Sequence, residues 1–248
     1  MDQADHFATR VVEMNEIKVN NPVVICGFLG STPAGTLTAS YLIENLKMHE
    51  VAHVRSSHLA PVAVFVGGKL RTPFRVYTHS SGKIMIITSE IPIDMEGLYE
   101  ISDTLINWLE KLKISELVIL EGIPVEQIPQ KRTTYGVADP EALSILKNKG
   151  IEIANSALVT GMGGALINEC LTRKIKAMSL LTPMFVGYPD PETVLSLVNA
   201  LNGLYDLNVT VSDLRSQVER IHGEVNKVVN NYNAMKKKEV MDSDILYQ

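Results

Sequence analysis

The chain has 248 residues, of which 46% are hydrophobic and 21% are charged, an ordinary globular composition that can bury a substantial core. The formal net charge of −5 argues against nucleic acid or an anionic membrane surface as the main partner. The two cysteines, Cys26 and Cys170, lie far apart and exclude a disulfide framework and a cysteine zinc site. A polar amino terminus and the lack of any apolar run of about 18 residues predict a cytoplasmic protein with no membrane span.

The first half of the chain alternates apolar, β-branched runs with amphipathic segments. Val23–Phe28 reads as a strand that meets a Gly/Ser/Pro turn, and a helical pattern follows over residues 34–48. The turn Ser80-Ser81-Gly82 predicts a hairpin between the strand-like runs on either side of it. Further strands are expected at residues 62–66, 74–78, 84–88 and 116–121, and an amphipathic helix at residues 95–113.

The same alternation continues in the second half. Helices are expected at residues 141–149, 165–174 and 192–205, and a strand at residues 175–181. Alternation of apolar strands with amphipathic helices predicts an α/β domain over residues 1–208, with a mixed, mostly parallel sheet and helices on both faces.

The segment from residue 209 to residue 238 has a different pattern. Its apolar residues are separated by steps of four and three, which is the seven-residue repeat of a coiled coil, sustained for about three heptads. This narrow seam predicts a long helix through which several copies of the chain associate. The seam residues are Leu214, Val218, Ile221, Val225, Val228, Tyr232 and Met235. The alternative is a long helix that lies along the core of its own domain.

Residues 239–248 have no periodicity and little apolar content, so we expect a flexible tail. The tail ends in Leu246-Tyr247-Gln248, a hydrophobic residue, a tyrosine and a free carboxylate. A partner's pocket can bury the leucine, hold the ring and its hydroxyl, and pair a lysine with the carboxylate.

This ending resembles the hydrophobic-tyrosine-X signature with which proteasome activators and assembly factors enter pockets between alpha subunits of the core particle. The body is similar to the proteasome assembly chaperone family of the archaeal Pba type, and the ending resembles that of PbaB-like members. The stretches that carry this likeness are Gly27-Phe28, Glu121-Gly122-Ile123-Pro124, Gly161-Met162-Gly163-Gly164 and Gly187-Tyr188-Pro189-Asp190-Pro191.

The resemblance implies a nucleoside-phosphorylase-like α/β fold without catalysis or a cofactor. It also implies a chaperone or activator that docks Leu246, Tyr247 and Gln248 into the alpha ring of the proteasome core particle. A homo-oligomer of three or four copies would present several tails to the ring and gain affinity through effective concentration.

Two enzyme classes are the alternatives. His49-Glu50-Val51-Ala52-His53 matches the HExxH signature of zinc hydrolases, with His58 as a third ligand, but the segment reads as a strand, in which the histidines are about 13 Å apart. We therefore predict no metal. A nucleoside- or phosphate-processing enzyme could use the glycines of two loops to hold an anion, with Glu121 or Asp139 as acid or base. The glycines concerned are Gly27, Gly30, Gly35, Gly161, Gly163 and Gly164, and neither loop is a Walker or a GxGxxG motif.

Overall fold

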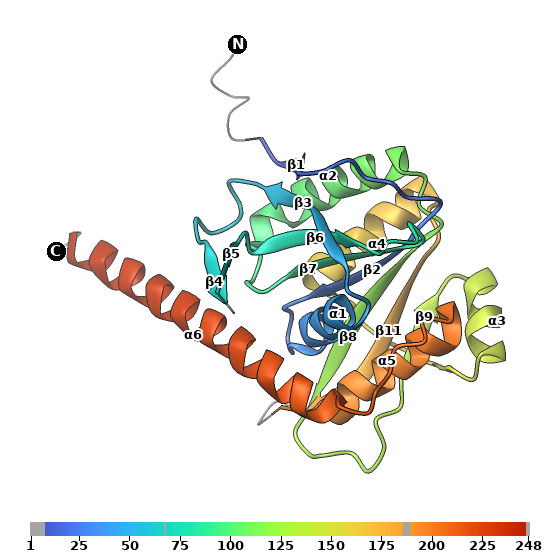
Figure 1. Ribbon diagram of the computed structural model, residues 1–248. Helices are drawn as coiled ribbons and strands as arrows, with labels where there is room; N and C mark the ends of the chain where they lie inside the picture. The colour runs from blue at the N-terminus through green and yellow to red at the C-terminus, as the bar shows by residue number, and fades with distance from the viewer. Residues whose placement is uncertain (1–7, 67, 186–188, 247–248) are drawn as a thin grey trace.

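The computed structural model describes residues 8–66, 68–185 and 189–246, with side chains as far as residue 237 in the last helix. A nine-stranded sheet has the order β1-β3-β6-β7-β2-β8-β11-β9-β10, and β4 and β5 form a separate hairpin (Figure 1). The strands are β1 (Arg10–Glu13), β2 (Val23–Phe28), β3 (His49–Arg55), β4 (Val64–Val66), β5 (Lys69–Arg71), β6 (Phe74–Thr78), β7 (Ile84–Ser89), β8 (Glu116–Val125), β9 (Tyr135–Ala138), β10 (Glu152–Ile153) and β11 (Ala177–Phe185).

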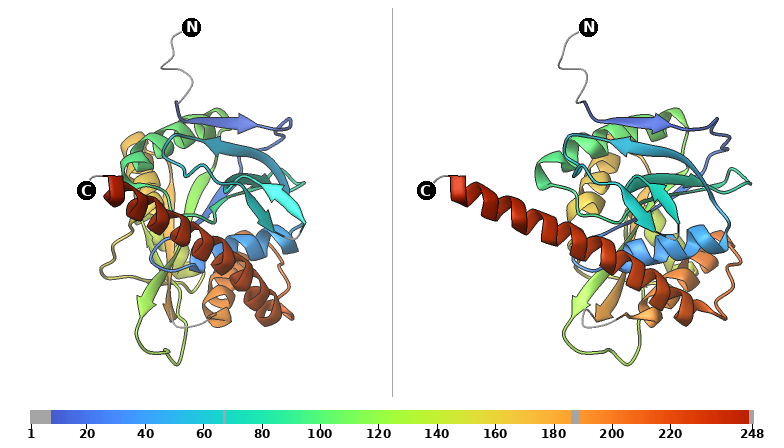
Figure 2. Two further views of the ribbon diagram at one scale, coloured as in Figure 1. Left: turned by 90° about the vertical axis from the view of Figure 1, so that its left-hand side faces the viewer. Right: turned by 60° about the vertical axis from the view of Figure 1, so that its left-hand side comes forward.

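The helices are α1 (Ala34–Asn45), α2 (Leu98–Lys111), α3 (Pro140–Asn148), α4 (Gly161–Arg173), α5 (Pro191–Tyr205) and α6 (Leu214–Leu246), and a short 3-10 helix, η2 (Met95–Gly97), precedes α2. Helices α1, α5 and α6 cover one face of the sheet, and α2 and α4 cover the other, as two views of the ribbon show (Figure 2). The prediction of helices on both faces is therefore correct.

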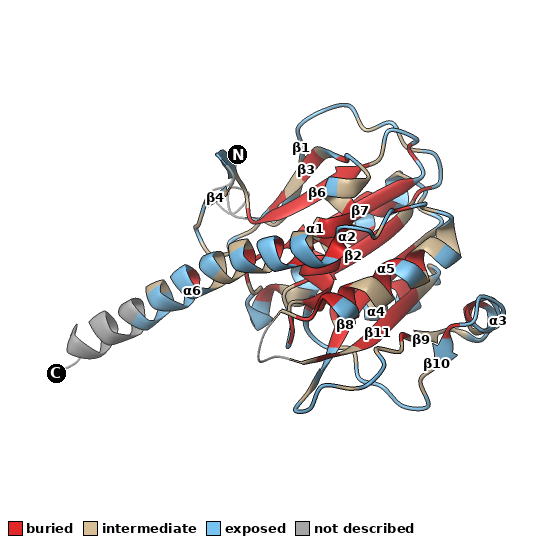
Figure 3. Ribbon diagram, turned by 60° about the horizontal axis from the view of Figure 1, so that its bottom comes forward, coloured by how far each residue is buried: buried red, intermediate tan, exposed pale blue. Residues whose placement is uncertain are grey.

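Alternate residues of the central strands supply the two cores. In β2, Ile25 packs under α1 and α5, whereas Val24 and Cys26 pack under α2 and α4. This alternation follows from the two-residue period of a strand. The central strands are buried along most of their length (Figure 3).

The expectation of a mostly parallel sheet is wrong. Neighbours in β7-β2-β8-β11 are parallel, but β1, β3, β6 and β7 pair antiparallel with one another, and β9 runs antiparallel to β11. Antiparallel strands can be joined by short hairpins, so part of the sheet is built without helical crossovers.

The coiled-coil prediction for the last helix is also wrong. Helix α6 is a single helix of 33 residues that contacts α1 and α5 of its own chain. Four members of the predicted seam are buried in the same core as those two helices: Leu214, Val218, Ile221 and Val225. Tyr232 is also buried, but outside that core. Val228 and Met235 are partly buried. The seam is narrow because α6 rests on the body along one stripe and leaves its outer surface to solvent (Figure 3).

Helix α6 also continues past the expected boundary at residue 238, as far as Leu246. Its carboxyl-terminal end extends beyond the body (Figures 1 and 2). The side chain of Leu246, and residues Tyr247 and Gln248, lie outside the described part of the chain.

Candidate functional site

Helix α6, which carries the predicted tail, is fixed to the body by polar contacts as well as by its apolar stripe. Asn45 on α1 donates a hydrogen bond to Gln217 of α6 at 2.8 Å, and Tyr41 on α1 donates from its hydroxyl to the carbonyl of Thr210, in the segment before α6, at 2.7 Å. Near the other end of the described side chains, Lys236 Nζ lies 2.8 Å from Asp94 Oδ1. Exposed ion pairs contribute little stability, so the apolar stripe holds the helix and the polar contacts fix its direction.

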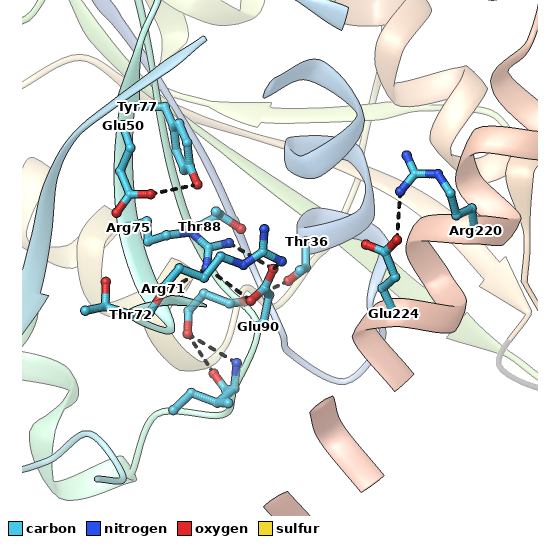
Figure 4. Close-up of polar contacts among 12 residues, drawn as sticks. Thr36, Glu50, Arg71, Thr72, Arg75, Tyr77, Thr88, Glu90, Arg220 and Glu224 are labelled. Carbon is cyan, nitrogen blue, oxygen red and sulfur yellow. Dashed lines mark hydrogen bonds and ion pairs between the residues drawn. The ribbon is translucent and has the colours of Figure 1, made fainter. Parts of the chain in front are cut away.

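A cluster of buried charges lies beneath α6 (Figure 4). Arg75 and Glu90 are only 2% and 3% exposed, and the guanidinium contacts both carboxylate oxygens, at 2.8 and 3.2 Å. Arg71 also donates to Glu90, at 2.6 Å. Burial on its own would lower the pKa of Arg75, but the hydrogen bonds and charge of Glu90 outweigh it, and the pKa is raised.

This cluster borders a cavity of about 60 Å³ that α6 closes with Ile221, Glu224 and Val225. The charges therefore lie in the surface on which α6 packs, and they do not form an open binding site. Sequence reasoning missed the cluster because a single glutamate after a strand carries no sign of burial, and its partner Arg75 is 15 residues away.

A larger cavity of about 500 Å³ lies beyond the carboxyl end of β2, against Glu121 in the middle of β8. It brings together four of the residues that the sequence singled out for an anion or acid–base site: Gly30, Glu121, Gly161 and Gly163. Helix α6 borders the same cavity with Asn226, Val229 and Asn233, which nothing in the sequence marked.

Among the described residues, Glu121 is the one acidic residue that borders this cavity, and it is partly buried. Burial raises its pKa to about 7. In the described part of the chain no side chain is hydrogen-bonded or ion-paired to its carboxylate. Glycines lie on two sides of it: a Cβ added at Gly163 would be 2.7 Å from Oε1, and one added at Gly30 would be 3.5 Å from Oε2.

The raised pKa of Glu121 predicts a pH-dependent stability. Between its unfolded value near 4.5 and about 7, the folded chain keeps a proton that the unfolded chain releases, so the free energy of unfolding falls as pH rises. Glu121→Gln removes this effect. When the pH is raised from 5 to 8, we expect the free energy of unfolding of the variant to increase by about 2–3 kcal/mol relative to that of the natural chain. Urea unfolding at the two pH values measures the difference, and equal changes for both proteins would contradict the assignment.

The HExxH match does not form a zinc site in the described chain. As expected, the motif lies in a strand, β3, where His49 is exposed and His53 is partly buried. His58 Nε2 lies 3.1 Å from Glu100 Oε2 on α2, so this side chain is paired with a glutamate of another element. Among the described residues, no group of three His, Cys, Asp or Glu side chains could hold a metal.

Asp139 does not join Glu121. It caps the amino terminus of α3, where its carboxylate accepts a hydrogen bond from the N–H of Ala142 at 2.9 Å. Its role is structural. In the described ranges, no helix is long and apolar enough to cross a membrane.

Comparison with known proteins identifies relatives over most of the chain. The model of the PAC2 family matches residues 24–229. A protein of unknown function from Thermoplasma acidophilum has a crystal structure with a TM-score of 0.85 and 46% identity, over 89% of this chain and 91% of that one.

Two solved structures from Pyrococcus furiosus are also similar. PbaA, an archaeal homolog of proteasome-assembly chaperone, has a TM-score of 0.77 and 25% identity, over 89% of this chain and 99% of that one. PbaB, an archaeal proteasome activator, has a TM-score of 0.76 and 18% identity, over 89% and 98%, and this likeness concerns the fold alone. These matches confirm the resemblance of the body to the archaeal Pba-type proteins, and the resemblance of the ending Leu246-Tyr247-Gln248 stays a prediction. The prediction of a nucleoside-phosphorylase-like fold is wrong, since the fold is that of the PAC2 proteins.

Proposed function

Because this chain belongs to the PAC2 family, we propose that it assists assembly or gating of the proteasome core particle by docking Leu246, Tyr247 and Gln248 into the alpha ring. The observation that carries the proposal is the likeness to PbaA over nearly the whole of that chain. It supports a chaperone-like role, and the sequence of the tail supports the mode of binding. The same proposal places the chain in the cytoplasm and gives it no catalytic activity of its own.

Helix α6 suits this role because it begins on the body and leads toward the end of the chain. Its first part is fixed by buried apolar residues, and its carboxyl-terminal end extends beyond the body (Figure 2). A helix rises about 1.5 Å per residue, so the 33 residues of α6 span roughly 50 Å. The tail would then reach its pocket while the body stays clear of the ring surface.

Several tails on one ring would bind more tightly than one, because the second contact is made at a high effective concentration. We therefore keep a homo-oligomer of three or four copies as part of the proposal. Since the seam is buried within its own chain, another surface would have to join the copies. Light scattering of the purified protein measures the mass, and a monomer at the concentrations that bind the core particle would refute this part.

The tail proposal predicts that Tyr247→Ala weakens binding to purified core particle at least tenfold, because the ring and its hydroxyl are both lost from the pocket. The measurement is a titration of labelled protein against immobilised core particle. Tyr99→Ala is the matched control, since Tyr99 lies on α2 and is 61% exposed. If both variants bind as the natural chain does, the tail is not the docking element.

A further inference from the structure

The 500 Å³ cavity beside Glu121 has the position and size of a small-molecule site. It lies where β2 and β8 run parallel and side by side. The chain leaves β2 for α1 on one face of the sheet, whereas α4, on the opposite face, leads into β11 beside β8. In open α/β sheets, ligands bind outside the carboxyl ends of the strands at such a switch point.

The charge in the cavity is not balanced by the protein. Glu121 is its acidic residue, and the described residues that line it include no lysine, arginine or histidine. A carboxylate that is partly desolvated and has no cationic partner favours a ligand that brings the missing positive charge. A protonated amino group also donates the hydrogen bonds that the carboxylate can accept.

A second polar feature lies beside the carboxylate. Helix α4 begins at Gly161, and Thr160 at its N-cap makes no side-chain hydrogen bond. The first intrahelical bond of this turn is made by the N–H of Gly164. Among the described residues, none accepts a hydrogen bond from the N–H groups of Gly161, Met162 and Gly163, and these three residues line the cavity. Such a group of N–H donors at the amino terminus of a helix favours an anion.

The remaining wall is largely apolar. Phe28, Ile93, Leu98, Met162 and Val229 line it, the last from α6. An uncharged hydrocarbon group of a ligand would be buried there, and its removal from water favours binding.

We propose that this cavity binds a free α-amino acid with an apolar side chain. Its ammonium group pairs with Glu121, its carboxylate accepts hydrogen bonds from the first turn of α4, and its side chain packs against the apolar wall. The two charged groups of an amino acid are close neighbours, and so are their counterparts here, since Gly163 in the first turn of α4 lies directly against the Glu121 carboxylate. This inference does not depend on docking to the proteasome, because none of the tail residues takes part.

Isothermal titration calorimetry of the full chain at pH 7.5 tests the proposal with five probes: alanine, valine, leucine, methionine and phenylalanine. At least one is expected to bind with a Kd of about 1 mM or tighter. Glu121→Gln should weaken that binding at least tenfold. Glu126→Gln, which makes the same charge change at an exposed position five residues along, should leave it unchanged. Circular dichroism melting of both variants confirms that they are folded.

Two analogues of the amino acid that binds most tightly test the contributions of the ammonium group and of the carboxylate separately. The methyl ester keeps the ammonium group and lacks the carboxylate charge, and the deaminated acid keeps the carboxylate and lacks the ammonium group. Each should bind at least tenfold more weakly than the amino acid. Binding by none of the five probes, equal binding by folded Glu121→Gln, or equal binding by either analogue would overturn the proposal.

Discussion

Replacing Glu90 with alanine is expected to lower the free energy of unfolding by about 3–5 kcal/mol. Glu90 is the shared carboxylate between Arg71 and Arg75, and it is 3% exposed. Without it, the fully buried guanidinium of Arg75 would lose its counter-ion and two hydrogen bonds. A buried charge that has lost its partner costs far more than the intact pair contributes.

Urea unfolding followed by circular dichroism measures this effect. Glu44→Ala is the matched control, because Glu44 forms an exposed ion pair with Arg220 of α6, and the loss of such a pair costs at most about 1 kcal/mol. A loss of less than 1 kcal/mol in the Glu90 variant would show that the cluster is open to solvent, and the packing of α6 over it would have to be revised.

The second large effect is expected for Ile221→Lys. Ile221 lies in the stripe of α6 that packs on the body and is 3% exposed. The substitution removes a buried side chain and puts an unpaired ammonium group in its place, so we expect a loss of about 4 kcal/mol or more in the free energy of unfolding. Asn230→Lys introduces the same charge at an exposed position of α6 and should change stability by less than about 0.5 kcal/mol.

This substitution also separates the two interpretations of the apolar repeat. If the repeat packs within the chain, Ile221→Lys lowers the free energy of unfolding. A variant that stays fully stable and only falls to a smaller mass in light scattering would mean that the stripe joins separate copies, and the intrachain position of α6 would be incorrect.

The sequence predicted the elements whose side chains are buried on both faces. The apolar runs of β2, β7 and β8 were recognised because strands covered on two sides are apolar throughout. The edge strands β1 and β10, the hairpin strand β5 and the interior strand β9 were missed. All four are only two to four residues long, so no periodic signal marks them.

The apolar repeat of the last helix was recognised, but its partner was misjudged. A three-and-four spacing states only that one stripe of a helix is covered. Whether the cover is α1 of the same chain or a second copy depends on contacts such as that between Asn45 and Gln217, 172 residues apart. The cavity was predicted in part, because the two glycine loops and Glu121 were candidate site residues. The residues that α6 contributes could not be predicted, because they depend on how that helix packs on the body.

The most direct measurement is an electron-microscopy reconstruction of proteasome core particle incubated with the full chain and, in parallel, with a chain that lacks residues 246–248. We expect density for Leu246, Tyr247 and Gln248 between adjacent alpha subunits with the full chain, and bare rings with the shortened one. Rings that are bare in both samples, or a shortened chain that occupies the ring as fully as the intact one, would contradict the proposed function.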